Sequence, residues 1–193
     1  MPYQCIPLEQ DTSEWHRWRS AGIGASDAPC LMGENPWKSA AALTHEKLHP
    51  RAGGGTNAAM ERGKALEPVA RASYCESRRI TVQPSCVQSR SKPWMRASLD
   101  GLNEDERLVV EIKCGESCYK RTAAGRAVPD CYYGQLQHIL AVLEYASIDF
   151  WCYSPAKRPL RLEVSRDDRY ISRLIARETA FWESIGPSVL ARL

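Results

Sequence analysis

Residues 94–114 contain two strand-like runs joined by a polar loop, and this arrangement constrains the fold more than any other feature of the chain. Trp94–Leu99 alternates apolar and polar residues, Leu108–Cys114 is largely apolar, and Gly101–Arg107 between them is polar. This pattern predicts an antiparallel β-hairpin. A sheet needs a covering layer to form a core, so the other segments must supply that layer.

Side chains alternate between the two faces of a strand, which groups the polar residues of this hairpin. Arg96, Ser98 and Asp100 fall on one face of the first strand, and Glu111 and Lys113 fall on one face of the second. We expect the hairpin to bring these faces together. A Glu and a Lys in an apolar strand are costly to desolvate without partners. The group is therefore either a catalytic site or a solvated ion pair beside a turn residue, and so short a pattern by itself favours the ion pair.

The catalytic alternative has a definite chemistry. Asp100 and Glu111 carry hard oxygen ligands suited to Mg²⁺ or Mn²⁺, and the backbone carbonyl of Ile112 could join them. Lys113 would be placed to orient or help deprotonate a water molecule near a phosphate.

The remaining periodic segments predict a mixed α/β (α+β) chain. Small and apolar residues recur every three or four positions over Asn57–Arg79, which predicts a helix with Glu67 beside its apolar face and a bend or a second helix at Pro68. Pro129 precedes another such helix, and Gly186-Pro187 should stop the last one. We expect helices over 13–19, 26–32, 39–48, 57–79, from 129 to about 143 and 167–185, the first three each opening on a capping Ser, and further strands over 80–83, 148–153 and 160–164.

The composition is that of one globular domain covering residues 1–193. Hydrophobic residues make up 44% and charged residues 25% of the chain, and Pro50–Gly55 is its one linker-like stretch. The sequence has no apolar run of the roughly 18 residues that a membrane helix needs and no signal-peptide pattern, so we expect a cytoplasmic protein without a membrane partner. The net charge of +3 permits a nucleic-acid partner without requiring one.

Eight cysteines are scattered along the chain, and we expect free thiols. An alternative is a zinc or iron–sulfur site built from some of Cys114, Cys118, Cys131 and Cys152, although the chain has no CxxC pair. The spacing alone does not decide between the two.

Six segments together carry a family resemblance. They are RSAGIGASDAP (19–29), GENPWKS (33–39), GKALEPVAR (63–71), RASLDGL (96–102), VEIKC (110–114) and YYGQLQH (132–138). In order and spacing, over nearly the whole chain, they resemble the phage-type alkaline exonucleases, the lambda exonuclease and YqaJ-like viral recombinase family of the PD-(D/E)XK nuclease superfamily. Six co-linear motifs are far more specific than any one of them.

The resemblance implies a PD-(D/E)XK, restriction-endonuclease-like core with a mixed central β-sheet flanked by helices. It places the family's acidic pair and lysine on Asp100, Glu111 and Lys113, and its helical glutamine on Gln135. It also adds Glu67 as a metal ligand. From the residues alone, Glu67 and Gln135 could equally be ordinary polar residues of helices. The implied metal ligands are Glu67, Asp100, Glu111 and the Ile112 carbonyl, which would hold two Mg²⁺ ions, with Mn²⁺ as an alternative.

The same resemblance implies a pocket for the 5′-phosphate of a DNA end. Arg19 and Ser26 match residues that bind this phosphate, and Ser98 would be a third. Tyr132, one turn before Gln135 on the same helix face, would also contact DNA. An Arg fork suits phosphate, but from the residues alone Ser26 could be a plain helix cap and Arg19 a solvated helix residue. The implied division is an N-terminal helical part over 1–56 that contributes this pocket and a nuclease core over 57–193.

The function that the resemblance implies is a Mg²⁺-dependent 5′-to-3′ exonuclease. It would digest one strand of linear double-stranded DNA and leave 3′ overhangs for phage-type recombination by strand annealing. Expected partners are double-stranded DNA ends, a single-strand annealing protein of the Red-beta or RecT type, and further copies of the chain in a homotrimeric ring, in the cytoplasm of a bacterial host of a phage or prophage. Two alternatives stay open: a Cas4-like, RecB-like or endonucleolytic enzyme on the same fold, and a non-catalytic protein that binds DNA ends.

Overall fold

A mixed seven-stranded β-sheet runs through the computed structural model, which describes residues 1–49 and 58–192. The linker-like stretch at 50–55, the start of the helix expected from residue 57 and the expected division between residues 56 and 57 lie outside the described residues. The strands are β1 (Tyr3–Ile6), β2 (Ile23–Gly24), β3 (Gln83–Ser89), β4 (Met95–Asn103), β5 (Leu108–Cys114), β6 (Ser147–Tyr153) and β7 (Leu160–Ser165). The helices are α1 (Ser13–Ser20), a 3₁₀ turn (Ala25–Asp27), α2 (Ala28–Met32), α3 (Ala40–Leu48), α4 (Ala58–Arg78), α5 (Glu116–Gly125), α6 (Asp130–Leu143) and α7 (Asp168–Leu190).

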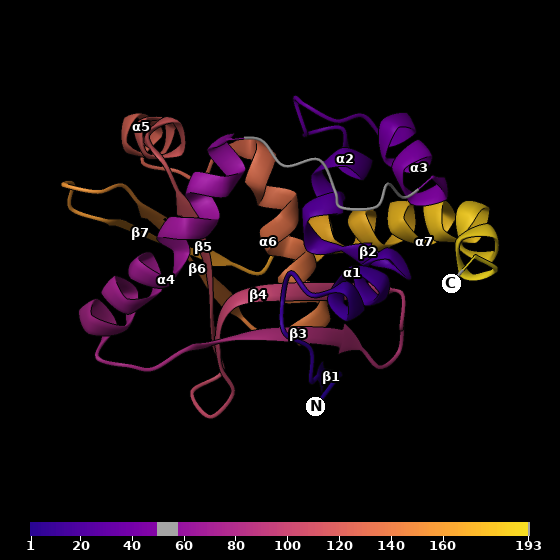
Figure 1. Cartoon of the computed structure of the whole chain (residues 1–193), viewed down its shortest axis with the longest axis horizontal. Coiled ribbons are helices and arrows are strands. Elements are labelled where there is room, and N and C mark those ends of the chain that lie inside the picture. The colour runs from indigo at the N-terminus through magenta and orange to yellow at the C-terminus, as the bar shows by residue number, and fades with distance from the viewer. Residues whose placement is uncertain (50–57, 193) are drawn as a thin grey trace.

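The strand order is β1-β3-β4-β5-β6-β7, with β2 paired to β4 off this path. The β5–β6 and β2–β4 pairs are parallel and the others are antiparallel. The expected hairpin of β4 and β5 is present, and the fold class is confirmed as a mixed sheet flanked by helices. In Figure 1, α1, α2, α3 and α7 gather at one end of the molecule, and α5 and β7 lie at the other.

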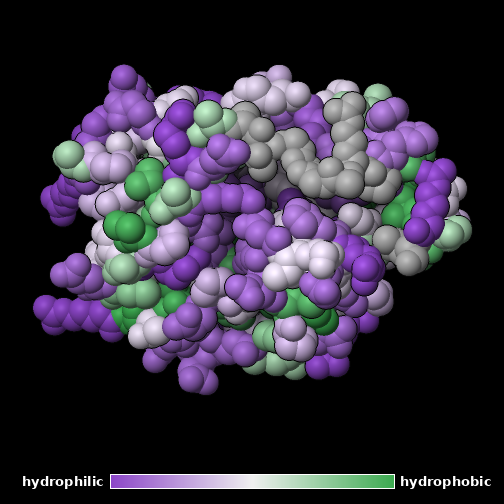
Figure 2. Space-filling model, in the orientation of Figure 1, coloured by the Kyte–Doolittle hydropathy of each residue, from purple (hydrophilic) through white to green (hydrophobic). Residues whose placement is uncertain are grey.

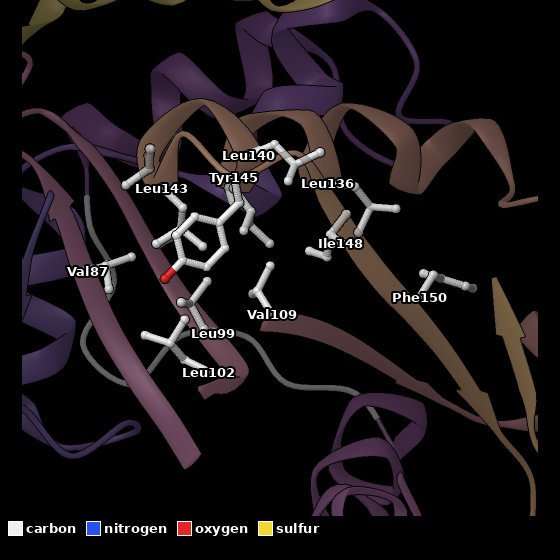
Figure 3. Packing of buried hydrophobic residues seen from close by; sticks show 14 of the residues in the cluster. Val87, Leu99, Leu102, Val109, Leu136, Leu140, Leu143, Tyr145, Ile148 and Phe150 are labelled. Carbon is white, nitrogen blue, oxygen red and sulfur yellow. The ribbon is translucent and has the colours of Figure 1, made fainter. Parts of the chain in front are cut away.

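The main core lies between α6 and one face of the sheet. Leu136, Leu140 and Leu143 of α6 pack over apolar residues of β3 to β6 (Figure 3), and each of these leucines is fully buried. Apolar burial of this kind is the largest favourable contribution to folding. The core therefore fixes α6, and with it every side chain that α6 turns toward β5.

A second, smaller core lies between α4 and the other face. Ala70 and Tyr74 of α4 pack with Val110 and Ile112 of β5 and with Trp151 of β6. α6 covers the face of β5 that carries Val109 and Glu111, and α4 covers the opposite face. β5 is therefore buried on both faces.

Two of the three helices expected before residue 50 are confirmed with small changes at their ends, and the third is not one continuous α-helix. Ser39 caps α3 by accepting a hydrogen bond from the N–H of Ala42, as expected. Thr12, and not Ser13, caps α1. Ser26 lies inside the 3₁₀ turn and accepts no capping hydrogen bond, so the expected helix over 26–32 is a 3₁₀ turn followed by the short α2.

α4 continues past Pro68 as one helix, so no second helix begins there, and the bend expected as the alternative stays a prediction. The expected stop at Gly186-Pro187 is wrong, because α7 continues past both residues to Leu190. Ile185 and Val189, which lie before and after Gly186 and Pro187, are buried. Packing of this last turn therefore outweighs the hydrogen bond that Pro187 cannot donate.

The strand expected over 80–83 is also misplaced, because β3 begins only at Gln83 and runs to Ser89. Its sequence, QPSCVQS, carries little strand propensity, and its pairing with β1 and β4 defines it. The short strands β1 and β2 and the helix α5 were not expected. None of the described helices is long and apolar enough to cross a membrane.

Candidate active site

A β-bulge in β4 decides where Asp100 lies. Leu99 and Leu102 pair with residues of β3 that are only two positions apart, so β4 has one extra residue between them. Both leucines belong to the core under α6, which strict alternation does not allow for residues three positions apart. The expected alternation therefore fails between Leu99 and Leu102, the stretch that contains Asp100.

The bulge also changes which residues share a face. Leu99 lies in the same core as Val109 of β5, and Glu111 follows Val109 by two positions on the same face. Glu111 and Lys113 therefore lie on the side of Leu99 and not on the side of Ser98. The expectation that the hairpin would unite Ser98 with Glu111 is wrong, because the extra residue reverses the alternation.

The Asp100 carboxylate lies where β5 separates from β4. The β4–β5 pairing ends at Gly101 and Val110, and beyond it Asp100 Oδ2 accepts a hydrogen bond from the backbone N–H of Ile112 at 2.7 Å. On the same edge of β4, β2 pairs only with Met95 and Arg96. Within the described residues, the stretch 97–100 therefore has no strand on this edge, and the Asp100 carboxylate takes the place of a strand partner.

Glu111 is the buried centre of the site. Its side chain is 2% exposed, and its Oε1 accepts hydrogen bonds from Lys113 Nζ at 2.5 Å and from Gln135 Nε2 of α6 at 2.5 Å. Its Oε2 is buried and has no hydrogen-bond partner. A buried acceptor without a partner carries a desolvation cost that a bound group would relieve.

Tyr132 completes this side of the site, one turn before Gln135 on α6 as expected. The Nζ of Lys113 lies 5.3 Å from the centre of the Tyr132 ring, within reach of a cation–π interaction. Burial lowers the pKa of Lys113, but the carboxylates of Glu111 and Asp100 outweigh this and raise it above its usual range. Gln135 therefore supports the Glu111 carboxylate directly from α6.

Glu67 reaches the same region from α4. Its Oε1 accepts a hydrogen bond from Nη2 of Arg71, one turn later, and Nε of Arg71 donates to the backbone carbonyl of Asp100 at 2.5 Å. Burial raises the pKa of Glu67, and Glu111 adds to this while Arg71 opposes it. Burial also raises the pKa of Asp100 well above its ordinary value, and Glu111 raises it further. The structure thus brings all the expected residues of the metal and catalytic group into one electrostatically coupled cluster.

These residues fit a hard divalent cation in their chemistry. They offer carboxylate oxygens, an unpaired buried Oε2 on Glu111 and a raised pKa on Asp100 that a nearby cation would lower. Their carboxylates are not assembled into a metal-binding arrangement in the structure. Among the described residues no three His, Cys, Asp or Glu side chains are close enough together to hold a metal, and one oxygen of Glu67 and one of Glu111 accept hydrogen bonds from protein donors.

A second group of expected residues surrounds Trp15 of α1. Arg19 Nη2 donates to Ser26 Oγ at 2.5 Å, and the Arg19 guanidinium lies 5.1 Å from the centre of the Trp15 ring. Trp15 Nε1 donates to Ser98 Oγ on β4 at 2.8 Å. Arg19, Ser26 and Ser98 are therefore brought together by Trp15, which was not expected from the sequence. A Trp four residues before an Arg on a helix is the signal that could have indicated this stacking.

A buried ion pair holds the loop that carries Ser26. Asp27 accepts from the backbone N–H of Gly24 at 3.0 Å, and Lys47 of α3 lies 2.8 Å from the Asp27 carboxylate. Both side chains are 8% exposed. Burial alone would raise the pKa of Asp27, but Lys47 and Arg19 lower it. The Ser26 hydroxyl, by contrast, is exposed, so it is available to a ligand.

The surface over these two groups is polar. Figure 2 shows mainly hydrophilic residues across the middle of the face between α4 and α1. A cavity of about 370 Å³ adjoins the first group, between the segment 8–11 and α4, and Glu67 and Arg71 are among its lining residues. The cavity thus borders the first group at Glu67 and Arg71.

The cysteines do not form the thiolate site that was considered as an alternative. Cys118 and Cys152 lie close, with their Sγ atoms 3.5 Å apart, but within the described part of the chain no group of three potential ligands includes them. None of the eight cysteines, all of which lie in the described part of the chain, forms a disulfide.

Sequence comparison identifies the family. The YqaJ-like viral recombinase domain matches residues 14–146, which is more than half of the chain. The chain belongs to this family. The matched range contains both groups of residues described above. A curated relative, the uncharacterized protein YqaJ of Bacillus subtilis (strain 168), is 26% identical over 180 residues, and these cover 90% of this chain and 56% of the relative. The chain therefore spans little more than half the length of that relative.

Solved structures support the same assignment for this YqaJ-like chain. It is similar to the crystal structure of an alkaline exonuclease (LHK-Exo) from Laribacter hongkongensis, with a TM-score of 0.79 and 26% identity over 93% of this chain and 95% of that one. A structure of LHK-Exo in complex with dAMP matches equally well, at 25% identity. A phage-related exonuclease from Haemophilus somnus 129PT shares the fold, with a TM-score of 0.65 and 14% identity over 89% of this chain and 96% of that one.

Proposed function

We propose that this YqaJ-like chain is a Mg²⁺-dependent 5′-to-3′ exonuclease that digests one strand of linear double-stranded DNA and leaves a 3′ overhang. The observation that carries the proposal is the buried Glu111 carboxylate, held by Lys113 and Gln135 beside Asp100. The likeness to an alkaline exonuclease over 93% of the chain supports it. A solvated ion pair, the alternative to catalysis, does not explain a Glu that is 2% exposed with one oxygen unpaired.

Glu67, Asp100 and Glu111 would hold the metal, as two Mg²⁺ ions with Mn²⁺ as a substitute. The backbone carbonyl of Ile112 would join them, because in a strand it points to the same side as the Ile112 N–H that Asp100 accepts. A divalent cation supplies a Lewis acid that lowers the pKa of water and offsets charge on a phosphate. Glu67 would bind it while its Oε1 keeps the contact with Arg71.

Lys113 and Gln135 would act around the reacting phosphate. The Lys113 ammonium would donate a hydrogen bond to the attacking water and hold it in line with the scissile bond. Gln135 would keep the Glu111 carboxylate in one orientation, as its contact in the structure already does. Tyr132 would limit the movement of the Lys113 side chain and lie along the DNA.

The group around Trp15 would bind the 5′-phosphate of the DNA end. Arg19 presents a guanidinium fork, and Ser26 and Ser98 add hydroxyl groups beside it. Ser98 and Asp100 are two positions apart on β4, so the same strand connects this pocket to the metal site. The N-terminal part over 1–56 would thus select the DNA end, and the core over 57–193 would cut it, in a single domain.

A digestion of end-labelled DNA tests the proposal. Purified protein with Mg²⁺ should shorten a 5′-phosphorylated linear duplex from its 5′ ends, release the 5′ label first and leave a closed circle intact. Chelation of the metal should stop the reaction. Failure to shorten the duplex would indicate a non-catalytic DNA-end-binding protein, and equal cutting of the circle would indicate an endonuclease.

If Arg19 binds the 5′-phosphate, its removal should slow digestion of 5′-phosphorylated ends more than digestion of 5′-hydroxyl ends. Arg19→Ala should slow digestion of 5′-phosphorylated ends by roughly 10-fold to 100-fold, the loss expected for a charge-assisted contact of about 1.5–3 kcal/mol. Digestion of 5′-hydroxyl ends should change little. Arg17→Ala, on the exposed side of the same helix, is the control. An equal loss on both kinds of end would contradict a phosphate pocket.

We further propose the setting in which this activity would serve recombination. The 3′ overhang is the substrate of a single-strand annealing protein of the Red-beta or RecT type, which would be the functional partner. A homotrimeric ring around the DNA would keep the enzyme on its substrate, in the cytoplasm of a bacterium that carries a phage or prophage.

A further inference from the structure

Arg71 contacts two of the proposed metal ligands at once. Its Nε donates to the backbone carbonyl of Asp100 at 2.5 Å, and its Nη2 donates to Oε1 of Glu67. Glu67 precedes Arg71 by one turn of α4, whereas Asp100 lies in the bulge of β4. The guanidinium therefore connects the helix that carries one ligand to the strand that carries another.

The environment of Arg71 favours a fixed position. Its side chain is 16% exposed, and that of Glu67 is 30% exposed, so neither is a freely moving surface group. The planar guanidinium can donate in two fixed directions from one rigid group, and a lysine ammonium cannot reproduce that geometry. Further along α4, Tyr74 donates to Asp149 of β6, which anchors the helix independently of Arg71.

We infer that Arg71 is a positioning residue that sets the Glu67 carboxylate and the Asp100 backbone in the arrangement that binds a divalent cation. The inference rests on the proposed function for the identity of the ligands. Arg71 itself is a cation and does not contact the metal. It acts through the two groups that it holds, in the way that outer contacts orient the ligands of protein metal sites.

Arg71→Lys isolates the geometry, because it keeps the charge and removes the fork. The matched control is Arg78→Lys, the same change two turns later on α4, where the guanidinium is 3.6 Å from Asp149. We expect Arg71→Lys to weaken Mn²⁺ binding roughly 10-fold to 100-fold in calorimetric titrations without DNA, and to slow cleavage by a similar factor. Arg78→Lys should change neither. Equal Mn²⁺ affinity in the two variants would overturn the inference.

A rescue experiment covers the case in which Arg71→Lys folds poorly. Guanidinium ion at low millimolar concentration should restore part of the Mn²⁺ binding of Arg71→Ala, and ammonium at the same concentration should not. Recovery with both ions, or with neither, would contradict a role for the fork. Thermal midpoints of all variants, measured by circular dichroism, show whether each protein is folded during the titration.

The metal titration separates this inference from the proposed function. If the wild-type protein fails to cleave DNA but Arg71→Lys still binds Mn²⁺ more weakly than Arg78→Lys, the exonuclease proposal falls and the positioning role stands. If the wild-type protein cleaves DNA and both variants bind Mn²⁺ alike, the positioning role falls and the exonuclease proposal stands.

Discussion

Lys113→Ala should reduce cleavage of a 5′-phosphorylated duplex by roughly 10²-fold to 10⁴-fold, the range expected when a positioned proton-transfer or water-orienting group is removed. The Lys113 ammonium is 2.5 Å from Glu111 Oε1, and the Lys113 side chain is 24% exposed while that of Glu111 is 2% exposed, so the lysine is the more accessible member of the pair. DNA binding should persist. At most one phosphate contact is lost. The magnitude of the slope of log binding constant against log salt concentration should therefore fall by about 1.

Two further variants make this test specific. Lys113→Met keeps the apolar stem beside Tyr132 and should be as inactive as Lys113→Ala, because the ammonium is the missing group. Lys120→Ala, an exposed lysine on α5, should keep full activity. Affinity is measured by fluorescence anisotropy with Ca²⁺ in place of Mg²⁺. Undiminished cleavage by Lys113→Ala would remove this lysine from the mechanism.

Glu178→Ala should destabilise the protein by about 3 kcal/mol, near the lower end of the range for breaking a buried ion pair. Glu178 of α7 lies 2.7 Å from His138 Nδ1 of α6, and both side chains are fully buried. His138 Nε2 is 3.1 Å from the backbone carbonyl of Arg96, so both ring nitrogens face acceptors, as in a doubly protonated imidazolium. The loss is measured by urea unfolding. Glu183→Ala, an exposed position on the same helix, should cost less than about 0.5 kcal/mol.

The same pair predicts a pH dependence with a definite sign. Burial opposes the charged form of His138, but the Glu178 carboxylate and the Arg96 carbonyl outweigh it, with a smaller contribution from Asp27, and the pKa is raised. Stabilisation from a raised pKa is fully present below the pKa of the unfolded chain, about 6.5, and is lost as pH rises through the raised value. Wild-type stability should therefore fall relative to Glu178→Gln as pH rises above about 6.5. Parallel curves for the two proteins would contradict a charged His138.

Local pattern was enough to place the long elements. The strand over Leu108–Cys114 begins and ends as expected, and the apolar period after Pro129 locates α6. These elements are predictable because burial against one or two faces leaves a repeating apolar signature. The strands that were missed or misplaced, β1, β2 and β3, have little such signature. They exist because pairing with other strands satisfies their backbone groups.

In the candidate site, too, some features could be predicted from local spacing and others depended on long-range contacts. Spacing alone placed Glu111 and Lys113 on one face, and the six motifs added Glu67, Gln135 and the phosphate-pocket residues. Spacing could not show that Asp100 lies in a bulge and accepts the Ile112 N–H, because a bulge depends on the register between two strands. It also could not show Arg71 or Trp15 as connecting residues, since one partner of each, Asp100 for Arg71 and Ser98 for Trp15, is distant in sequence.

By itself, then, the sequence determined which chemical groups are present, the family and the periodic elements that carry them, because these depend on residue type and local spacing. Only the tertiary structure decided how those groups are held. It turned Asp100 toward β5, buried Glu111 under α6 with one oxygen unpaired, and joined Glu67 to Asp100 through Arg71. The physical reason is that burial, and the hydrogen bonds that burial requires, are set by long-range packing between α4, α6 and the sheet.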